Sequence, residues 1–321
     1  MTLLEDADAE LVGPAAPDPA ALVRVGAARA PDVDPHLVYL AGLSTEKSRR
    51  TQRTALRVVA GLIGSSPERL AWERLRYQHT SAIRTRLAER YAPATVNRFL
   101  SAIRGVLLEA RRLGLMSAED CAAASDVKPA KGERLPAGRA LARAEIKRLF
   151  AAAAADPLAG RRDAAIVALL FGCGLRRSEL VALDLVAFDP GAGALRVLGK
   201  GNKERLAYVA AGRPALDGWL ESRGAEPGPL FLPISSTGTF EFRRLSDDAV
   251  RGILARLARR ARVKKFSPHD LRRTFISTLL DAGADLSVVQ QLAGHAQVTT
   301  TQRYDRRGEA AKQRAAKLIK I

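Results

Sequence analysis

The stretch SPHDLRRTFISTLLDAGADLSVVQQLAGHAQVTTTQRYDR, residues 267–306, carries the polar residues around which the rest of the chain can be placed. Ser267 and Pro268 are typical of a helix start, because serine caps free amides and proline fits the first turn. His269 and Arg272 follow three positions apart, so both project from one face of that helix toward one spot. A helix N-terminus with an arginine fork beside it is suited to binding a phosphate.

A second polar group closes the same stretch. His295 comes directly after Gly294, which ends a short helical run, and Tyr304 lies nine residues further on. A turn at Gly294 can bring His295 and Tyr304 back to the spot that the first helix faces. The stretch therefore predicts a single site that combines a guanidinium, two imidazoles and a phenol.

An apolar run predicts a buried helix over 163–172. The motif GLRRSEL at 174–180 follows this helix and is polar. It contains Arg176 and Glu179. An arginine in such a place is more often a surface or structural group, so Arg176 alone is weak evidence for catalysis. A single histidine or tyrosine is equally weak evidence, and only the combination of these residues indicates a catalytic site.

The motif LGKGNKERL at 198–206 predicts a β-hairpin. Strand-like runs at 195–200 and 204–209 flank a Gly-Asn pair that is typical of tight hairpin turns. Lys200 stands at this turn, where a lysine is usually just solvated. The sequence GKGNK lacks the serine or threonine of a phosphate-binding P-loop, so nucleotide binding is not expected here.

Upstream, the region 36–125 predicts an all-helical domain. Apolar residues recur with helical spacing from Ser44 onward, and the clearest helix opens at Thr95 after Pro93 and stops at Gly114. Groups able to contact phosphates lie on the polar helix faces: Arg49, Arg53, Asn97, Arg98 and Arg104. On the sequence alone, an ordinary solvated basic face is an equally good interpretation.

The remaining segments complete the domain plan. Residues 1–35 are rich in Ala, Pro and Asp without a sustained period, which is typical of a flexible leader. Residues 126–138 contain Pro129 and Pro136, which predicts a linker before a second domain at 139–321. The expected fold is mainly α: a helical N-terminal domain, then a mixed α/β domain that is mostly helical with a small antiparallel sheet.

The composition is strongly basic. Lys and Arg number 52 against 34 Asp and Glu, and the net charge of +18 suits a polyanion such as nucleic acid or an acidic membrane surface. The N-terminus lacks a secretory signal, and the longest apolar run, 164–175, is shorter than the roughly 20 residues that span a bilayer. Cys121 and Cys173 are in no metal-ligand spacing and are expected in the core. We therefore expect a cytoplasmic protein without cofactor or metal.

Together these motifs resemble the boxes of the tyrosine recombinase, or phage integrase, family, which includes the Xer recombinases and Cre. All six catalytic positions of the family hold its residue types here: Arg176 in the first arginine box, Lys200 in the β-hairpin, His269 and Arg272 in the His-x-x-Arg box, His295 in the Gly-His box, and Tyr304 as the nucleophile. Glu179 matches an acidic position that supports the active site in the family. Arg273 and Ala293 depart from the frequent histidine and leucine. The resemblance covers residues 40–310.

The chemistry of DNA strand transfer agrees with these residue types. A phosphodiester resists attack, so a catalyst needs cations, a nucleophile and a proton donor. The expected roles are as follows: Arg176 and Arg272 bind the non-bridging oxygens, His295 adds a hydrogen bond, His269 is the base, and Lys200 protonates the leaving 5′ oxygen. Tyr304 would attack phosphorus and form a 3′-phosphotyrosine, which needs neither ATP nor metal.

The resemblance implies a site-specific recombinase for integration, excision or resolution, with the SAM-like core-binding domain of the family at its N-terminus. The leader is expected to be too short for an arm-binding domain, which favours a two-domain, Xer-like or Cre-like plan. Such an enzyme binds double-stranded DNA with inverted half-sites as a homo-tetramer on two sites, or as a hetero-tetramer with a paralogue. The tail after Tyr304 would then dock on a neighbouring subunit. Two alternatives are a type IB topoisomerase-like enzyme and a catalytically idle DNA-binding regulator.

Overall fold

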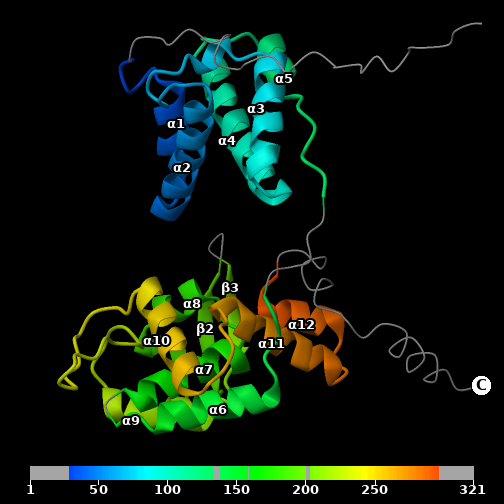
Figure 1. The fold of residues 1–321 in the computed structure, drawn as a ribbon. Helices are drawn as coiled ribbons and strands as arrows, with labels where there is room; N and C mark the ends of the chain where they lie inside the picture. The colour runs from blue at the N-terminus through cyan, green and yellow to red at the C-terminus, as the bar shows by residue number, and fades with distance from the viewer. Residues whose placement is uncertain (1–28, 133–137, 158, 200–202, 296–321) are drawn as a thin grey trace, which may run out of the picture. The chain divides into compact units, whose positions relative to one another are not determined.

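The structure is a computed structural model that describes residues 29–132, 138–157, 159–199 and 203–295. Two compact units divide the chain, Met1–Leu135 and Pro136–Ile321 (Figure 1). Lys200, Tyr304 and the tail that follows it lie outside the described residues. None of the helices in the described part of the chain is long and apolar enough to cross a membrane.

The regular elements in the described part of the first unit are all helical. Its elements are α1 (Pro35–Ala41), α2 (Glu46–Leu62), the short 3-10 turn η2 (Trp72–Arg74), α3 (Tyr77–Arg90), α4 (Pro93–Arg112) and α5 (Ala118–Ser125). The four residues Leu56, Ile83, Val106 and Leu107 are fully buried where α2, α3 and α4 meet. Apolar faces at helical spacing thus form one core, which is the main stabilising contribution in such a domain.

Local sequence explains where these helices begin. Thr45 accepts the amide of Ser48 and caps α2, as the onset of the pattern near Ser44 predicts. Helix α4 begins at Pro93 rather than at the expected Thr95, because proline is favoured at the first position of a helix. The end of α4 agrees with the prediction, since Gly114 follows it with a φ of 71°.

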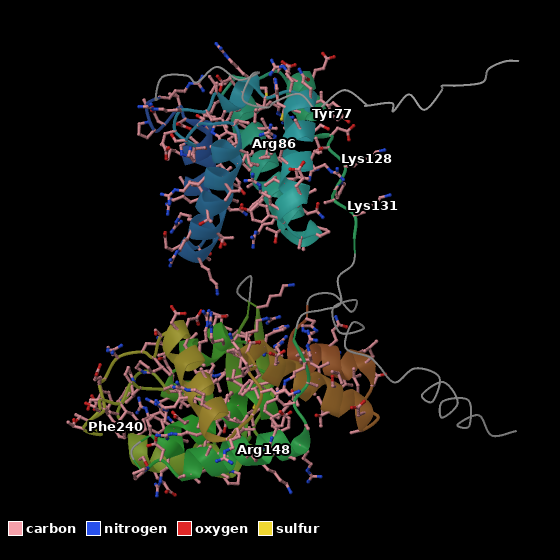
Figure 2. The ribbon with its side chains drawn as sticks, viewed as in Figure 1. Tyr77, Arg86, Lys128, Lys131, Arg148 and Phe240 are labelled. Carbon is pink, nitrogen blue, oxygen red and sulfur yellow. The ribbon has the colours of Figure 1, made fainter. Side chains whose placement is uncertain are left out.

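The first unit also holds parts of the two segments that flank it. Arg29 forms a bidentate ion pair with Glu73 at 2.6 and 2.9 Å, and Asp34 accepts the amide of His36 at the start of α1. After α5, Val127 is buried in the core. Lys128 and Lys131 in the same segment are exposed (Figure 2).

The second unit is a layered assembly of helices with a small sheet. Its described elements are α6 (Arg143–Ala154), α7 (Gly160–Gly172), α8 (Arg177–Ala182), η3 (Leu185–Ala187), α9 (Arg213–Arg223), α10 (Asp247–Arg260), α11 (Pro268–Asp281) and α12 (Leu286–Ala293). Helix α7 is buried along most of its length and contacts α6, α9, α10 and α11, so it forms the centre of this core. The sequence prediction of a buried helix at this position is confirmed.

The sheet of the second unit is antiparallel, in the order β1 (Phe188–Asp189), β2 (Ala194–Leu198) and β3 (Glu204–Tyr208). The predicted hairpin corresponds to β2 and β3, which pair from Ala194 opposite Tyr208 to Leu198 opposite Glu204. Strand β1 has two residues and gives no periodic signal, so the sequence did not reveal it. The expected fold class, mainly α with a small antiparallel sheet, is confirmed.

Candidate functional site

The candidate site is organised around the end of α12. Gly294 has φ 64° and ψ 47°, its amide bonds the carbonyl of Gln291 at 2.9 Å, and the amide of His295 bonds the carbonyl of Gln290 at 3.1 Å. This pair of bonds is the Schellman arrangement, in which the left-handed residue is usually glycine. The turn fixes the direction in which the chain leaves α12 and therefore the position of His295.

Three consecutive carbonyls at this helix end each accept a hydrogen bond from an arginine of a different element. Arg205 of β3 donates through Nε to the carbonyl of Leu292 at 3.2 Å. Arg272 of α11 donates through Nη2 to the carbonyl of Ala293, and Arg176 donates through Nη2 to the carbonyl of Gly294 at 2.8 Å. The last carbonyls of a helix lack partners within the helix and carry partial negative charge, so cations stabilise them.

Glu179 joins two of these arginines. Arg176 precedes α8 and donates to Glu179 through its backbone amide at 2.8 Å and through Nη1 at 2.5 Å. Arg205 Nη2 donates to the same carboxylate at 2.9 Å. Burial by itself would raise the pKa of Glu179, but the Arg176 amide and the two guanidiniums hold that pKa below its ordinary value. The carboxylate therefore stays ionised and keeps both arginines in place.

Arg272 is buried, with 1% of its surface exposed. Its Nη1 donates to the carbonyl of Gly174 at 2.6 Å. Gly174 has a φ of 58°, and a Cβ at this position would lie 2.3 Å from Cδ1 of Phe275. The glycine that opens the motif GLRRSEL is thus required for the chain to pass close to α11 and to present its carbonyl to Arg272.

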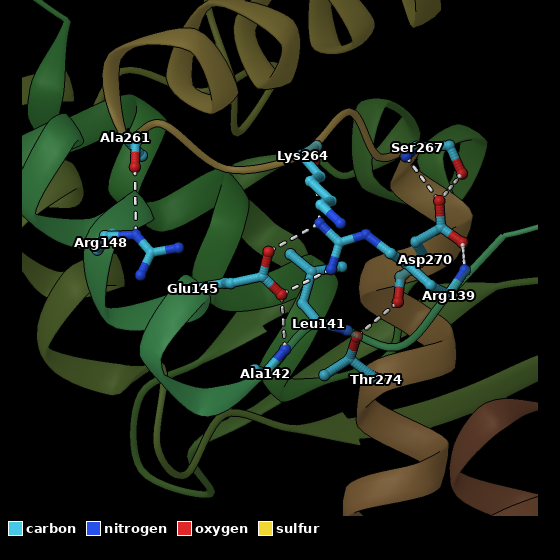
Figure 3. A network of polar contacts seen from close by, with 10 residues as sticks. All are labelled: Arg139, Leu141, Ala142, Glu145, Arg148, Ala261, Lys264, Ser267, Asp270 and Thr274. Carbon is cyan, nitrogen blue, oxygen red and sulfur yellow. Dashed lines mark hydrogen bonds and ion pairs between the residues drawn. The ribbon is translucent and has the colours of Figure 1, made fainter.

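The first turn of α11, which carries His269, is held by the segment that enters the second unit (Figure 3). Asp270 accepts the amide and the hydroxyl of Ser267 at 2.8 Å each, and the backbone amide of Arg139 at 2.9 Å. Gly138 has a φ of 100°, and a Cβ there would lie 2.1 Å from Oδ1 of Asp270. The side chain of Arg139 forms a bidentate pair with Glu145 at 2.6 and 2.9 Å.

Arg273 occupies the position where the family often has histidine. Its side chain is buried, and Nη1 donates to the carbonyl of Gly138 at 3.1 Å. In this chain, the residue after the second arginine therefore contributes to the contact between α11 and the entering segment.

Both candidate histidines have a low proton affinity. Burial, together with the positive charges of Arg272 and Arg176, lowers the pKa of His295 to about 4. Partial desolvation of its ring also lowers the pKa of His269, assisted by Arg272, although the residue as a whole remains exposed. Both rings are consequently neutral near pH 7, so each has one nitrogen that can donate a hydrogen bond and one that can accept a hydrogen bond or a proton.

The structure thus brings four predicted residues together: Arg176, His269, Arg272 and His295. It adds Arg205, which the sequence analysis missed. The two other predicted members of the site, Lys200 and Tyr304, are outside the described residues. Within the described ranges, no group of three or more His, Cys, Asp or Glu side chains could hold a metal ion.

The residues that we predicted to contact phosphates lie in the first unit and differ in their surroundings. Arg49 binds Glu46 at 2.8 Å, and Arg53 lies 3.9 Å from the same carboxylate, with 43% of its side chain exposed. Asn97 exchanges two hydrogen bonds with the backbone of Ala130. Arg104 donates to the carbonyls of Ser125 and Val127, and Arg98 is exposed with its guanidinium 5.6 Å from the centroid of Phe99.

Comparison with known proteins gives matches over most of the chain. The profile of the phage integrase family matches residues 139–310. The chain is 40% identical over 217 residues to tyrosine recombinase XerC of Azotobacter vinelandii, which covers 67% of this chain and 70% of that protein. It is 39% identical over 224 residues to tyrosine recombinase XerD of Pseudomonas aeruginosa, which covers 68% and 73%.

Two solved structures have a similar fold. The Tn1549 transposon integrase in complex with transposon right end DNA matches with a TM-score of 0.69 and 18% identity, over 90% of this chain and 98% of that one. A lambda integrase dimer bound to a COC′ core site matches with a TM-score of 0.62 and 18% identity, over 87% and 95%.

Proposed function

Because the chain belongs to the phage integrase family and is a site-specific DNA recombinase, we propose that six of its residues form the active site: Arg176, Lys200, His269, Arg272, His295 and Tyr304. The observation that carries this proposal is the end of α12. There Arg176 and Arg272 bind neighbouring carbonyls directly before His295. Two cations and a neutral imidazole are thereby gathered at one place.

The proposed roles follow from this arrangement. Arg176 keeps 36% of its side chain exposed while Glu179 and the Gly294 carbonyl hold two of its nitrogens, so it can meet a phosphate without losing its orientation. Arg272 adds a second fixed cation, which offsets the charge that builds up on the non-bridging oxygens in the transition state. His295 supplies a further hydrogen bond to the same group.

Proton transfer would involve the remaining residues. His269 has a pKa below its ordinary value and is therefore unprotonated near pH 7, so it can accept the proton of the Tyr304 phenol. Tyr304 attacks phosphorus, the bond to the 5′ oxygen breaks, and Lys200 donates a proton to that oxygen. The 3′-phosphotyrosine keeps the energy of the phosphodiester, and attack by the 5′ hydroxyl of another strand reverses the chemistry.

The first test is covalent capture on nicked suicide DNA substrates drawn from sites that flank the gene. The wild-type chain should form a protein–DNA adduct that resists denaturation, and Tyr304→Phe should form none while it still binds the same DNA. An adduct that persists in Tyr304→Phe would refute the assigned nucleophile. Relaxation of supercoiled DNA by the monomer without site preference would instead favour the topoisomerase-like alternative, and binding without any adduct would favour the idle regulator.

We further propose that the first unit is the core-binding domain and contacts the DNA backbone through Arg49, Arg53, Asn97, Arg98 and Arg104. The net charge of +18 and the exposure of Arg98 support this proposal. The proposed assembly is a homo-tetramer on two DNA sites with inverted half-sites in the cytoplasm, or a hetero-tetramer with a paralogue. Analytical ultracentrifugation with site DNA should give two chains on one site and four on a synaptic complex. One chain on each site would refute it.

A further inference from the structure

Strand β3 departs in part from the usual alternation between buried apolar and exposed polar residues. Leu206 and Tyr208 are about half exposed, at 49% and 55%. Arg205, which precedes Leu206 in the strand, points to the opposite, inner side of the sheet, where it pairs with the buried Val197. Only 12% of the Arg205 side chain is exposed. Burial of a cation is unfavourable unless it is paired, so a specific contact must hold Arg205 in this position.

The contacts of Arg205 run in two directions. One guanidinium nitrogen, Nη2, donates to Glu179 at 2.9 Å, and Nε donates to the carbonyl of Leu292 at 3.2 Å. The side chain also passes close to the turn after α12, because a Cβ on Gly294 would lie 2.9 Å from Cδ of Arg205. One residue of β3 is therefore in contact with both the partner of Arg176 and the turn that precedes His295.

We propose that Arg205 is a positioning residue of the recombinase: by bridging Glu179 and the Leu292 carbonyl, it fixes the end of α12, and with it His295, relative to Arg176. The proposal rests on the proposed function, in which Arg176 and His295 act on the scissile phosphate. Arg205 itself does not touch the reacting atoms. It determines whether the groups that do so are correctly spaced.

The geometry requires a guanidinium. A planar fork donates from two nitrogens at fixed angles, so it can bind a carboxylate and a backbone carbonyl at the same time. An ammonium group at the end of a flexible lysine can keep the charge beside Glu179 but cannot reproduce both directions. The base of the hairpin lies close by, since a Cβ on Gly199 would be 3.9 Å from Oε1 of Glu179. Glu179 thus joins Arg205 of β3 to Arg176 before α8 and lies near the base of the hairpin.

The experiment compares Arg205→Met and Arg205→Lys with Arg196→Met. Arg196 lies on the neighbouring strand, opposite Leu206, on the exposed face of the sheet, so its substitution removes the same charge without touching α12. Site binding, melting temperature and single-turnover cleavage at saturating suicide DNA are measured for each protein. We expect Arg205→Met to bind normally and to cleave about 100-fold more slowly, because a misplacement of about 1 Å has this cost. Arg205→Lys should cleave about 10-fold more slowly, and Arg196→Met at the wild-type rate.

Two results would overturn the proposal. Cleavage by Arg205→Met at the wild-type rate would show that the bridge is dispensable. Full rescue by Arg205→Lys would show that charge alone matters and that the position of the turn does not. If Arg205→Met fails to fold, Arg205→Lys still tests the proposal, because it keeps the charge and removes only the second direction of hydrogen bonding.

A second readout is independent of activity. The chain has four histidines, so a two-dimensional NMR spectrum of the imidazole nitrogens can be assigned with His→Gln variants. In the protein without DNA, the His295 signals should move in Arg205→Lys and stay unchanged in Arg196→Met. Unmoved signals in Arg205→Lys would refute the positioning role. If the His295 signals move in Arg205→Lys but the wild-type protein forms no adduct on any DNA, positioning is supported and the proposed function is refuted.

Discussion

In the first unit, Arg49, Arg53 and Arg98 lie at the surface, where two of them share the exposed carboxylate of Glu46. In the second unit, Arg176, Arg205 and Arg272 each bind one of three consecutive carbonyls at the end of a helix, and Arg272 is buried. Arginines at the surface add positive charge that can attract an anionic partner without a fixed geometry. Buried arginines with fixed acceptors hold backbone segments in a defined position, so their substitution disturbs both the fold and the site.

Arg272→Ala should have the largest effect and would test the second half of this comparison. Two buried carbonyls, of Gly174 and Ala293, would lose their donor, so we expect the free energy of unfolding to fall by about 3 kcal/mol. Cleavage should fall by about 1,000-fold, because the proposed fixed donor to the phosphate is also removed. Denaturant unfolding and single-turnover cleavage measure the two effects. Arg251→Ala, on an arginine with 64% of its side chain exposed, is the control and should change neither.

Glu179→Gln and Glu46→Gln extend the comparison to the carboxylates that bind the arginines of each unit. The neutral amide cannot hold both Arg176 and Arg205, so cleavage should fall by about 10- to 100-fold while DNA binding is kept. The matched change Glu46→Gln affects an exposed pair in the first unit, and such surface pairs contribute little to stability. Equal losses of stability and cleavage in the two variants would contradict the distinction between surface and buried arginines.

The pKa of His295 predicts how the second unit responds to acid. The folded pKa, about 4, lies below the ordinary value, so between pH 6.5 and 4 the unfolded chain binds a proton that the folded chain does not. Stability should therefore fall as the pH falls through this window, by at most about 3 kcal/mol. His295→Gln should reduce this loss.

The two tryptophans allow this effect to be measured in one unit at a time. Trp72 lies in the first unit and Trp219 in the second, and both are buried. In a Trp72→Phe background, fluorescence reports on the second unit alone during denaturant unfolding at pH 7 and pH 4.5. An identical pH response with and without His295 would show that another group is responsible.

The smallest effect is expected for Arg98→Ala in the first unit. The proposed phosphate contact of Arg98 would be lost, so the slope of log affinity against log salt should fall by about 1, with little change between DNA sequences. Cleavage at saturating DNA should stay at the wild-type rate. Arg104→Ala is the comparison variant, because Arg104 donates hydrogen bonds to the carbonyls of Ser125 and Val127 and therefore has a structural role. It should lower the melting temperature, whereas Arg98→Ala should not.

Sequence reasoning predicted the elements that local signals define. The Ser-Pro start of α11, the glycine end of α12 and the Gly-Asn hairpin all depend on residues that are neighbours in the chain. The sequence also predicted that Arg176 and Arg272 lie in one site, because the motifs that contain them are specific. Arg205 was not predictable in this way. Its strand places leucine and tyrosine outside, against the usual alternation, and its acceptor at Leu292 lies 87 residues away.

The contacts of the segment between the units could not be read from composition. The predicted linker 126–138 is rich in turn formers, yet the structure holds parts of it on both sides: Val127 is buried in the first unit, and Gly138 contacts Asp270 in the second. These contacts are long-range packing, which a search for periodicity cannot detect.

The contact between Gly138 and Asp270 has a practical consequence for the exchange of DNA specificities between relatives. A chimera that joins the first unit of one protein to the second unit of another should be cut before Gly138. A cut after Arg139 would combine a foreign glycine position and a foreign arginine with the native Asp270, Arg273 and Glu145. Such a hybrid would carry a mismatched anchor on the helix that bears His269 and Arg272, whatever DNA its first unit recognised.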